Sequence, residues 1–524
     1  MTIGSITFFV FLFLAFIVFY CCPVKARWGV LLMVSLAFCV CVAGWKALPM
    51  VVFASFMTWA GAICIDLIRR RCEKRLADEQ SDSKRRAIQA RSERCVKAVL
   101  LLSLILTVGL FATIKVIKVL DNMQLIYCYF RSDTMKLLAP LGMSYYILSL
   151  SGYVLDVYWK RYSAERNYFR ILLFGVYFPR IVQGPISRYN KLGAEFKKEL
   201  RYDRDKILFG LQLMLWGLGK KLVLADRINL FTSSIWSQKD PPGCIVLLAF
   251  MMDAFRLYMD FSGYMDIVKG VSEIFGVKLE ENFNHPFFSM SVAEFWRRWH
   301  ISLGAWFRDY VFMPVSMTRW MKKVTKQLKK NSHKHLSRMI KVSVPLLITW
   351  ILTGLWHGTG ANYLVWGLYY GILITVSELI AEPTDKFCSL IHLDRASISW
   401  RVFCMFRTFL FFTIGRMITV PGDLGKTFEY MQCIIMKNRI WCMFDESVFE
   451  YGLDYRQFNV LLIGAILVVI VSLLQEKGVP IREKIAKQPL LFRWAIYLVA
   501  IFTILIFGIY GPSYTPSNFA YMVY

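Results

Sequence analysis

The sequence predicts an all-α fold for a polytopic membrane protein. Apolar runs long enough to cross a bilayer recur along the 524-residue chain, and 57% of all residues are hydrophobic. About 20 apolar residues in a helix cross the hydrocarbon core, and a helix satisfies its own backbone hydrogen bonds. The net charge of +27 could suggest nucleic acid. Because the basic residues cluster in connections between the apolar runs, we expect contact with membrane lipid and no nucleic-acid partner.

The candidate membrane spans are distributed along the whole chain. Residues 245–261 and 403–418 are less clear spans, since each carries internal charge. The first run lacks a basic start and a small-residue cleavage site, so we do not expect a cleaved signal peptide. The clear spans are 6–22, 28–45, 51–68, 98–117, 363–380, 460–474 and 494–510.

Basic connections indicate the orientation of these spans. Residues 69–97 hold eleven Lys and Arg against five acids, and 319–341 hold nine and no acid. A third basic connection lies at 477–493. Such loops are expected on the cytoplasmic side, whereas 119–133 and 511–524 are poor in positive charge and are expected outside. Both termini are therefore predicted to lie outside.

One segment of the middle region is predicted to be re-entrant. The apolar stretch 171–178 is too short to cross about 30 Å at 1.5 Å per residue. Basic residues flank it on both sides, and Pro179 to Arg188 follow it. Irregular backbone at membrane depth must be buried in protein or line a wet cavity.

A second segment, 294–310, is predicted to form one partly buried or interfacial helix at the cytoplasmic side. Trp296, Trp299, Leu303 and Trp306 fall at helical spacing and would form one apolar stripe. Its arginines fall elsewhere, and the segment carries too many charges to face lipid.

Two of the six histidines could carry chemistry. His357 follows the apolar run 342–356 and precedes a glycine, and ionisable groups at membrane depth are costly and often functional. Imidazole transfers protons near neutral pH. His300 also follows a tryptophan, and taken alone each histidine could equally be a core residue. The others are expected to be solvated or to occupy a turn, namely His333, His335, His392 and His285.

Metal and nucleotide chemistry find no support in the motifs. Two histidines without a nearby third ligand rarely hold zinc, so we expect no metal. The 13 cysteines include no Cys-x-x-Cys pair and are interpreted as small apolar residues. The chain has neither a phosphate-binding loop nor a Gly-x-Ser-x-Gly elbow. Charged residues in apolar surroundings either pair with one another or bind a phosphate-bearing substrate, namely Lys220, Lys221, Asp253, Asp260, Asp266 and Asp309.

Six ordered motifs resemble the membrane-bound O-acyltransferase family, and most closely its bacterial branch of alginate O-acetylation and teichoic acid D-alanylation. The likeness covers about 137–375. It rests on Phe178-Pro179 with Gln183-Gly184-Pro185-Ile186-Ser187-Arg188-Tyr189, Asp260-Phe261-Ser262-Gly263-Tyr264-Met265-Asp266, Glu281-Asn282-Phe283-Asn284, Phe295-Trp296-Arg297-Arg298-Trp299-His300-Ile301-Ser302-Leu303, Trp306-Phe307-Arg308-Asp309-Tyr310 and Gly354-Leu355-Trp356-His357-Gly358.

The resemblance implies about ten to twelve transmembrane helices, with re-entrant and interfacial helices, around a central tunnel. We expect one integral membrane domain over 1–524, with peripheral helices in 1–118, the catalytic core in 137–380 and further helices in 400–524. The resemblance makes His357 the essential histidine and His300 its companion. Tunnel-lining candidates are Trp296, Trp299, Asn282, Arg308, Asp309, Trp356 and Asp260. Weaker candidates for binding the donor phosphates are Lys220, Lys221, Arg180 and Arg188.

The expected function is an acyltransferase of the bacterial cytoplasmic membrane with no bound cofactor. The donor would be acetyl-CoA or another thioester from the cytoplasm, and the acceptor an envelope or exported polysaccharide, reached through an outer-face partner acyltransferase. If 319–341 is cytoplasmic, 342–356 rises about 22 Å, which puts His357 near the outer side and His300 nearer the inside. A transporter or flippase explains broken helices equally well. An acyltransferase acting on a lipid or protein is a further alternative.

Overall fold

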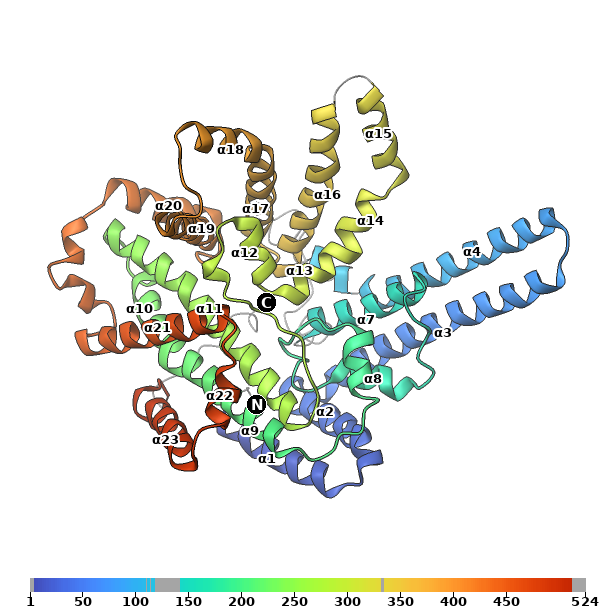
Figure 1. Cartoon of the computed structure of the whole chain (residues 1–524), viewed down its shortest axis with the longest axis horizontal. Coiled ribbons are helices and arrows are strands. Elements are labelled where there is room, and N and C mark those ends of the chain that lie inside the picture. The colour runs from blue at the N-terminus through green and yellow to red at the C-terminus, as the bar shows by residue number, and fades with distance from the viewer. Residues whose placement is uncertain (1–3, 110, 114, 118–141, 331–333, 511–524) are drawn as a thin grey trace. The chain divides into compact units, whose positions relative to one another are not determined.

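The computed structural model describes residues 4–109, 111–113, 115–117, 142–330 and 334–510. These residues form helices and no named strand, so the predicted all-α class is confirmed (Figure 1). In this part of the chain the only extended pairing recorded is an isolated antiparallel bridge between Phe283 and Trp299.

The chain divides into two compact units, each described by itself. The first unit comprises Met1–Gly210 and Val271–Glu280, and the second comprises Leu211–Gly270 and Glu281–Tyr524. Whether they act as one integral membrane domain stays a prediction.

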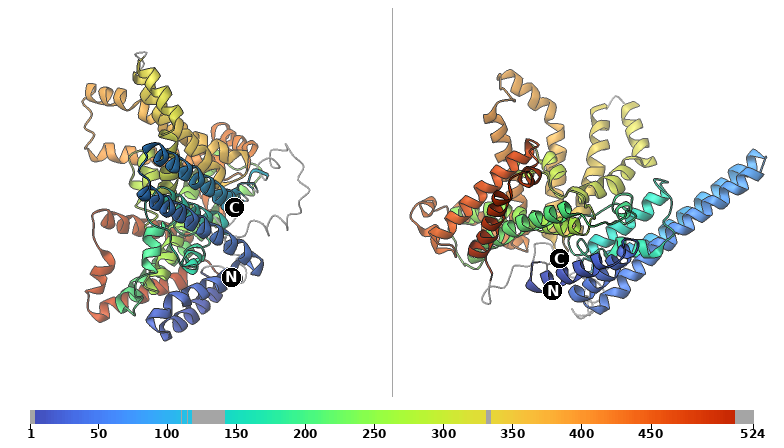
Figure 2. Two further views of the ribbon diagram at one scale, coloured as in Figure 1. Left: turned by 90° about the vertical axis from the view of Figure 1, so that its right-hand side faces the viewer. Right: turned by 60° about the horizontal axis from the view of Figure 1, so that its bottom comes forward.

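The first unit contains the amino-terminal helices and a long helical hairpin. Its α-helices are α1 (Ile6–Cys21), α2 (Arg27–Ala43), α3 (Leu48–Asp78), α4 (Asp82–Leu104), α7 (Met143–Tyr158), α8 (Tyr168–Val176) and the start of α9 (Arg204–Leu218). Helices α3 and α4 lie side by side in both views of Figure 2. The prediction of a loop at 69–97 is therefore wrong, because this basic stretch is helical except at 79–81.

The predicted re-entrant segment is a short helix followed by buried irregular backbone. Helix α8 has nine residues, and every residue from Ile171 to Ser187 is buried. A nine-residue helix is too short to cross a bilayer, as the sequence predicts. Re-entry of this segment into the membrane stays a prediction.

The second unit holds the carboxy-terminal half of the chain. Its α-helices after α9 are α10 (Asp226–Trp236), α11 (Gly243–Ile274, whose end belongs to the first unit), α12 (Val292–Arg298), α13 (Ile301–Phe307), α14 (Met313–Ser316), α15 (Arg319–Lys330), α16 (Lys334–His357), α17 (Ala361–Leu379), α18 (Ala381–Leu390), α19 (Ile398–Thr419), α20 (Leu424–Met436), α21 (Tyr455–Glu476), α22 (Ile481–Ala486) and α23 (Leu490–Phe507). π-Helices interrupt it at Gly219–Ala225 (η5) and Arg308–Phe312 (η7).

The prediction of one helix over 294–310 is wrong. Helix α12 ends before Trp299, and α13 begins after His300, whose φ of 46° is left-handed. The bridge from Phe283 to Trp299 holds the break, together with hydrogen bonds from the backbone N–H of Asn284 to Arg298 and of Ile301 to Asn282. The predicted apolar stripe is therefore divided between two helices. The break at Trp299 and His300 changes the direction of the chain, so Leu303 and Trp306 do not continue the helix face of Trp296.

The second basic stretch is also helical where it is described. Residues 319–341 were predicted as a loop, but α15 and the start of α16 pack as a hairpin. The Ser337 hydroxyl donates to the Thr325 carbonyl, 2.9 Å away, across this hairpin.

Seven of the described helices are long and apolar enough to cross a membrane, and up to nine if each of two bent pairs is one span. The chain is thus a multi-pass membrane protein. Helix α11 is long but carries charges along its length, among them Asp253, Arg256, Asp260 and Asp266, and it is not among these seven.

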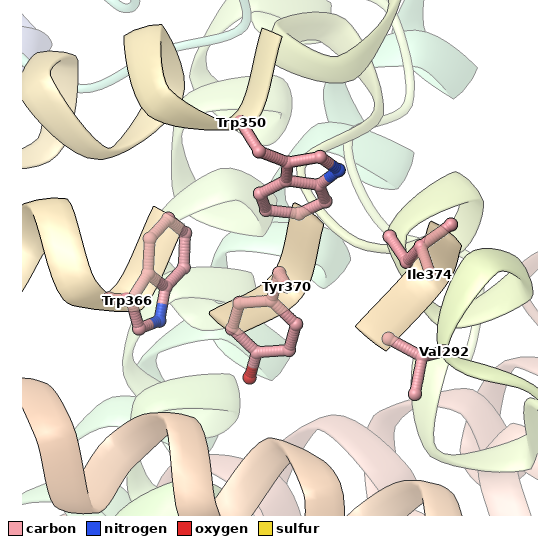
Figure 3. Packing of buried hydrophobic residues seen from close by; sticks show 5 residues of the cluster. All are labelled: Val292, Trp350, Trp366, Tyr370 and Ile374. Atoms are coloured by element: carbon pink, nitrogen blue, oxygen red, sulfur yellow. The ribbon is translucent and has the colours of Figure 1, made fainter. Parts of the chain in front are cut away.

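Close contact between α16 and α17 positions the candidate site. A Cβ atom on Gly354 would lie 2.3 Å from the Tyr363 carbonyl oxygen, and one on Gly367 would lie 2.5 Å from that of Trp350. Only glycine permits such an approach, as is common where membrane helices pack tightly. Figure 3 shows the buried cluster that Trp350 of α16 and Trp366, Tyr370 and Ile374 of α17 form with Val292.

Candidate functional site

His357 is the last residue of α16 and is only 7% exposed. Its imidazole lies against two indole rings, with centroid distances of 4.8 Å to Trp356 and 5.0 Å to Trp366. Residues 358–360 then lead directly into α17. The base candidate is thus held at the end of a helix, in apolar surroundings that exclude most water.

His300 occupies the break between α12 and α13 and is 2% exposed. Its Nδ1 lies 3.2 Å from Oδ1 of Asn282. An amide oxygen only accepts hydrogen bonds, so Nδ1 carries the proton and Nε2 carries the lone pair. Burial lowers the pKa of His300 to about 3, so this imidazole is neutral at physiological pH.

Asn282 fixes the orientation of His300. Its Oδ1 also accepts from the backbone N–H of Ser302 at 3.0 Å and from the Ser302 hydroxyl at 2.8 Å. These donors establish which end of the amide is oxygen. Because Asn282 is 1% exposed, the network is shielded from solvent and holds the left-handed turn in place.

Trp356 links the two histidines. Its ring centroid lies 6.0 Å from that of His300 and 4.8 Å from that of His357. The structure therefore brings together three residues predicted from two separate motifs.

Trp296 forms part of an aromatic wall next to His357. Its ring lies 4.9 Å from Trp350, 5.6 Å from Trp366 and 4.8 Å from Tyr370. The Nε1 of Trp296 is buried and has no hydrogen-bond partner among the described residues. This N–H is available to a substrate acceptor atom.

The remaining tunnel candidates lie in other surroundings. Trp299 packs within a buried cluster that includes Phe283, Phe295 and Phe412, at centroid distances of 5.0–5.5 Å. Arg308 and Asp309 pair at 2.8 Å, and the Arg308 side chain is 65% exposed. The roles of these three residues in the tunnel stay predictions.

The two candidate lysines are held by buried carboxylates. Lys221 Nζ lies 2.7 Å from Asp260 and 2.9 Å from Asp226, while Lys220 Nζ lies 2.6 Å from Asp266 and 2.9 Å from the Ser262 hydroxyl. Both lysines belong to the π-helix η5, a feature frequent at functional sites. Since their charge is already compensated, these contacts favour the alternative in which they fix helix packing.

Arg180 and Arg188 belong to the first unit. Arg180 is 2% exposed and donates to the Ser149 hydroxyl at 2.8 Å and to the Phe174 carbonyl. Arg188 lies 4.0 Å from Asp156. Binding of the donor phosphates by the two lysines and two arginines stays a prediction. Their contacts within the protein argue against it, because these contacts already occupy the cationic groups.

Sequence reasoning missed Asn362, the second residue of α17. It is 2% exposed, and its Nδ2 is buried without a hydrogen-bond partner among the described residues. The signal was present, since this amide follows His357 by five residues across a glycine-rich turn. A search for ionisable groups passes over a neutral amide.

These features define a membrane protein with a buried histidine beside an aromatic wall and a neutral second histidine. Residues 98–419 match the model of the membrane-bound O-acyltransferase family. The chain belongs to this family.

Several curated bacterial proteins are similar. A "Probable alginate O-acetylase" of Pseudomonas syringae pv. tomato is 30% identical over 54% of this chain and 49% of the relative. A peptidoglycan O-acetyltransferase of Helicobacter pylori is 27% identical over 49% and 50%. A teichoic acid D-alanyltransferase of Bacillus subtilis is 32% identical over 48% and 62%. The chain spans about half the length of the curated relatives it matches.

Proposed function

We propose that the protein is an O-acyltransferase of the bacterial cytoplasmic membrane. It transfers an acyl group, most simply acetyl, from a cytoplasmic thioester such as acetyl-CoA to a hydroxyl at the outer face. The observation that carries this proposal is the burial of His357 against Trp356 and Trp366. The names of the similar proteins support acyl transfer to envelope or exported polymers.

In the proposed reaction His357 is the general base. An imidazole nitrogen takes the proton from the acceptor hydroxyl as its oxygen bonds to the thioester carbonyl carbon. The carbonyl π electrons move onto oxygen and then return, which breaks the carbon–sulfur bond. The leaving thiolate takes the proton from the His357 imidazolium, so the base is regenerated and the products are an ester and a free thiol.

His300 orients the donor in this proposal. Its neutral state and lowered pKa make it a poor proton donor, since a general acid needs a pKa near the operating pH. The lone pair on its Nε2 is suited to accept a hydrogen bond from a donor N–H group. Trp296, Trp356 and the rings beside them would exclude water from the thioester.

The test is transfer of label from acetyl-CoA by purified protein in vesicles. The unmodified protein should acetylate an added polysaccharide or partner transferase and release free thiol. His357→Ala should lower the rate by about 10²–10⁴ while leaving the folded protein in the membrane. His392→Ala, which removes an exposed histidine, is the control and should keep full activity.

The same assay separates the alternatives. A transporter would move label across the vesicle without forming a new ester. Labelled lipid or protein would identify those acceptors in place of a polysaccharide. In a background without native cysteines, a cysteine at 357 should react with small reagents from outside faster than one at 300, and the reverse order would refute the proposed direction of the path.

A further inference from the structure

We infer that Asn362 and the first turn of α17 form an oxyanion site, which stabilises the negative charge on the donor carbonyl oxygen during transfer. This inference rests on the proposed role of His357 as the base. It assigns a catalytic function to a residue outside the two histidines and the aromatic wall.

The amide of Asn362 is a buried donor to which the described part of the chain offers no acceptor. The residue is 2% exposed, and its Nδ2 has no hydrogen-bond partner among the described residues. Buried polar groups are nearly always satisfied, so an unsatisfied one requires an explanation. A substrate oxygen that accepts from Nδ2 supplies that explanation.

The start of α17 adds positive potential at the same place. This helix has 19 residues, and its N-cap is Gly360, so no side chain caps it. The amino-terminal end of a helix carries partial positive charge and N–H groups suited to bind anions. A Cβ atom at residue 360 would lie 2.3 Å from Asn362 Oδ1, so the Asn362 side chain folds back over this helix end.

The site lies next to the base. His357 packs on Trp366 with ring centroids 5.0 Å apart. Asn362 precedes Trp366 by four residues, so both lie on one face of α17. Only residues 358–360 separate the end of α16 from the start of α17. The amide donor and the imidazole therefore flank one tight turn.

This arrangement matches the charge changes of acyl transfer. As the acceptor oxygen bonds to the carbonyl carbon, the π electron pair moves onto the carbonyl oxygen. The Nδ2–H of Asn362 donates to that oxyanion while His357 holds the acceptor proton. When the carbonyl re-forms, the carbon–sulfur bond breaks and the thiolate takes the proton from His357.

Asn362→Ala in the full-length protein in vesicles tests the inference, with acetyl-CoA as donor. We expect kcat to fall by about 10²–10³, as for loss of one oxyanion donor, while KM for the donor changes less than about threefold. The thermal midpoint should stay the same or rise, because the variant removes an unsatisfied buried donor. Affinity for S-ethyl-CoA, which lacks the carbonyl oxygen, should not change.

Thr375→Val is the matched control on the same helix. Its hydroxyl is likewise buried without a partner among the described residues, and the variant should keep the wild-type kcat. Gly360→Ala, which leaves the amide intact but displaces it, should also lower kcat. If Asn362→Ala does not accumulate as folded protein, Asn362→Ser, which keeps a small donor, should show a smaller loss of kcat than Gly360→Ala.

Opposite results identify which idea fails. Wild-type kcat in Asn362→Ala, or a kcat that falls only together with the thermal midpoint, overturns the oxyanion site. An unmodified protein without any transfer, or His357→Ala with full transfer, overturns the proposed function instead.

Discussion

The imidazole of His357 packs on the indole of Trp366 with ring centroids 5.0 Å apart and an interplanar angle of 74°. His357 ends α16 and Trp366 lies in the second turn of α17, so their contact sets the angle at which the base faces a substrate. Trp366 in turn packs on Trp350 and Tyr370, at 5.8 Å and 5.1 Å. The orientation of the base thus depends on a wall of rings.

Replacing Trp366 by a smaller ring should therefore lower the catalytic rate more than it weakens substrate binding. We expect Trp366→Phe, which keeps a ring but leaves a gap, to lower kcat by about tenfold to a hundredfold with little change in KM, because small displacements of a reacting group are costly. Phe403→Leu, an exposed aromatic residue of α19, is the control and should keep wild-type kinetics. An unchanged kcat in Trp366→Phe would show that the ring does not position the base.

Gly354→Ala should separate α16 from α17. The added methyl would meet the backbone carbonyl of Tyr363 at 2.3 Å, and backbone cannot turn aside as a side chain can. We expect a loss of about 1–3 kcal/mol in the free energy of unfolding, measured by thermal or denaturant unfolding in detergent, together with reduced activity.

Gly304→Ala is its control in α13. The nearest atom to the added methyl there is 3.7 Å away, which is ordinary contact. Alanine favours helix over glycine by about 0.5–1 kcal/mol, so this variant should be neutral or stabilising. Equal stability losses in the two variants would contradict the role given to the close helix contact.

Removing Lys221 should destabilise the second unit strongly. Lys221→Met would leave Asp226 and Asp260, 0% and 1% exposed, without their shared cation. Breaking a buried pair in this way costs about 3–5 kcal/mol. The exposed Lys239→Met is the control, and addition of Asp260→Asn to Lys221→Met should recover part of the loss in an unfolding assay.

The acid limb of the pH–rate profile should be independent of His300. A general base acts only in its neutral form, so the acid limb reports protonation of the base. Because the pKa of His300 is lowered to about 3 by burial, this residue stays neutral across that range. His300→Gln should reduce the rate but leave the midpoint of the acid limb unchanged, and a shifted midpoint would assign the titration to His300.

The apolar runs predicted most helices, because their length matches the bilayer and their side chains specify the environment. The basic stretches 69–97 and 319–341 are predicted as loops because their positive charge is typical of cytoplasmic loops, although the helix propensity of their residues is high. Neither contains Gly or Pro, and Arg, Lys and Glu are good helix formers. That signal was available in the sequence.

The helix break at His300, by contrast, could not be predicted from the local sequence. Its left-handed turn depends on pairing with 282–284, some eighteen positions earlier, and local helical spacing across 294–310 conceals it. Asn362 likewise becomes a candidate site residue only because its side chain is buried and its Nδ2 has no hydrogen-bond partner among the described residues. Motifs placed the two histidines, whereas tertiary contacts defined what surrounds them.

The glycine contact between α16 and α17 also bears on how the protein moves. With backbones touching at Gly354 and Gly367, neither helix can slide or rotate on the other without a steric clash. Any opening that admits donor or releases product must then come from other segments. The helix pair that carries the base would act as a stationary frame through each turnover, and a covalent link between these two helices would leave the catalytic cycle running.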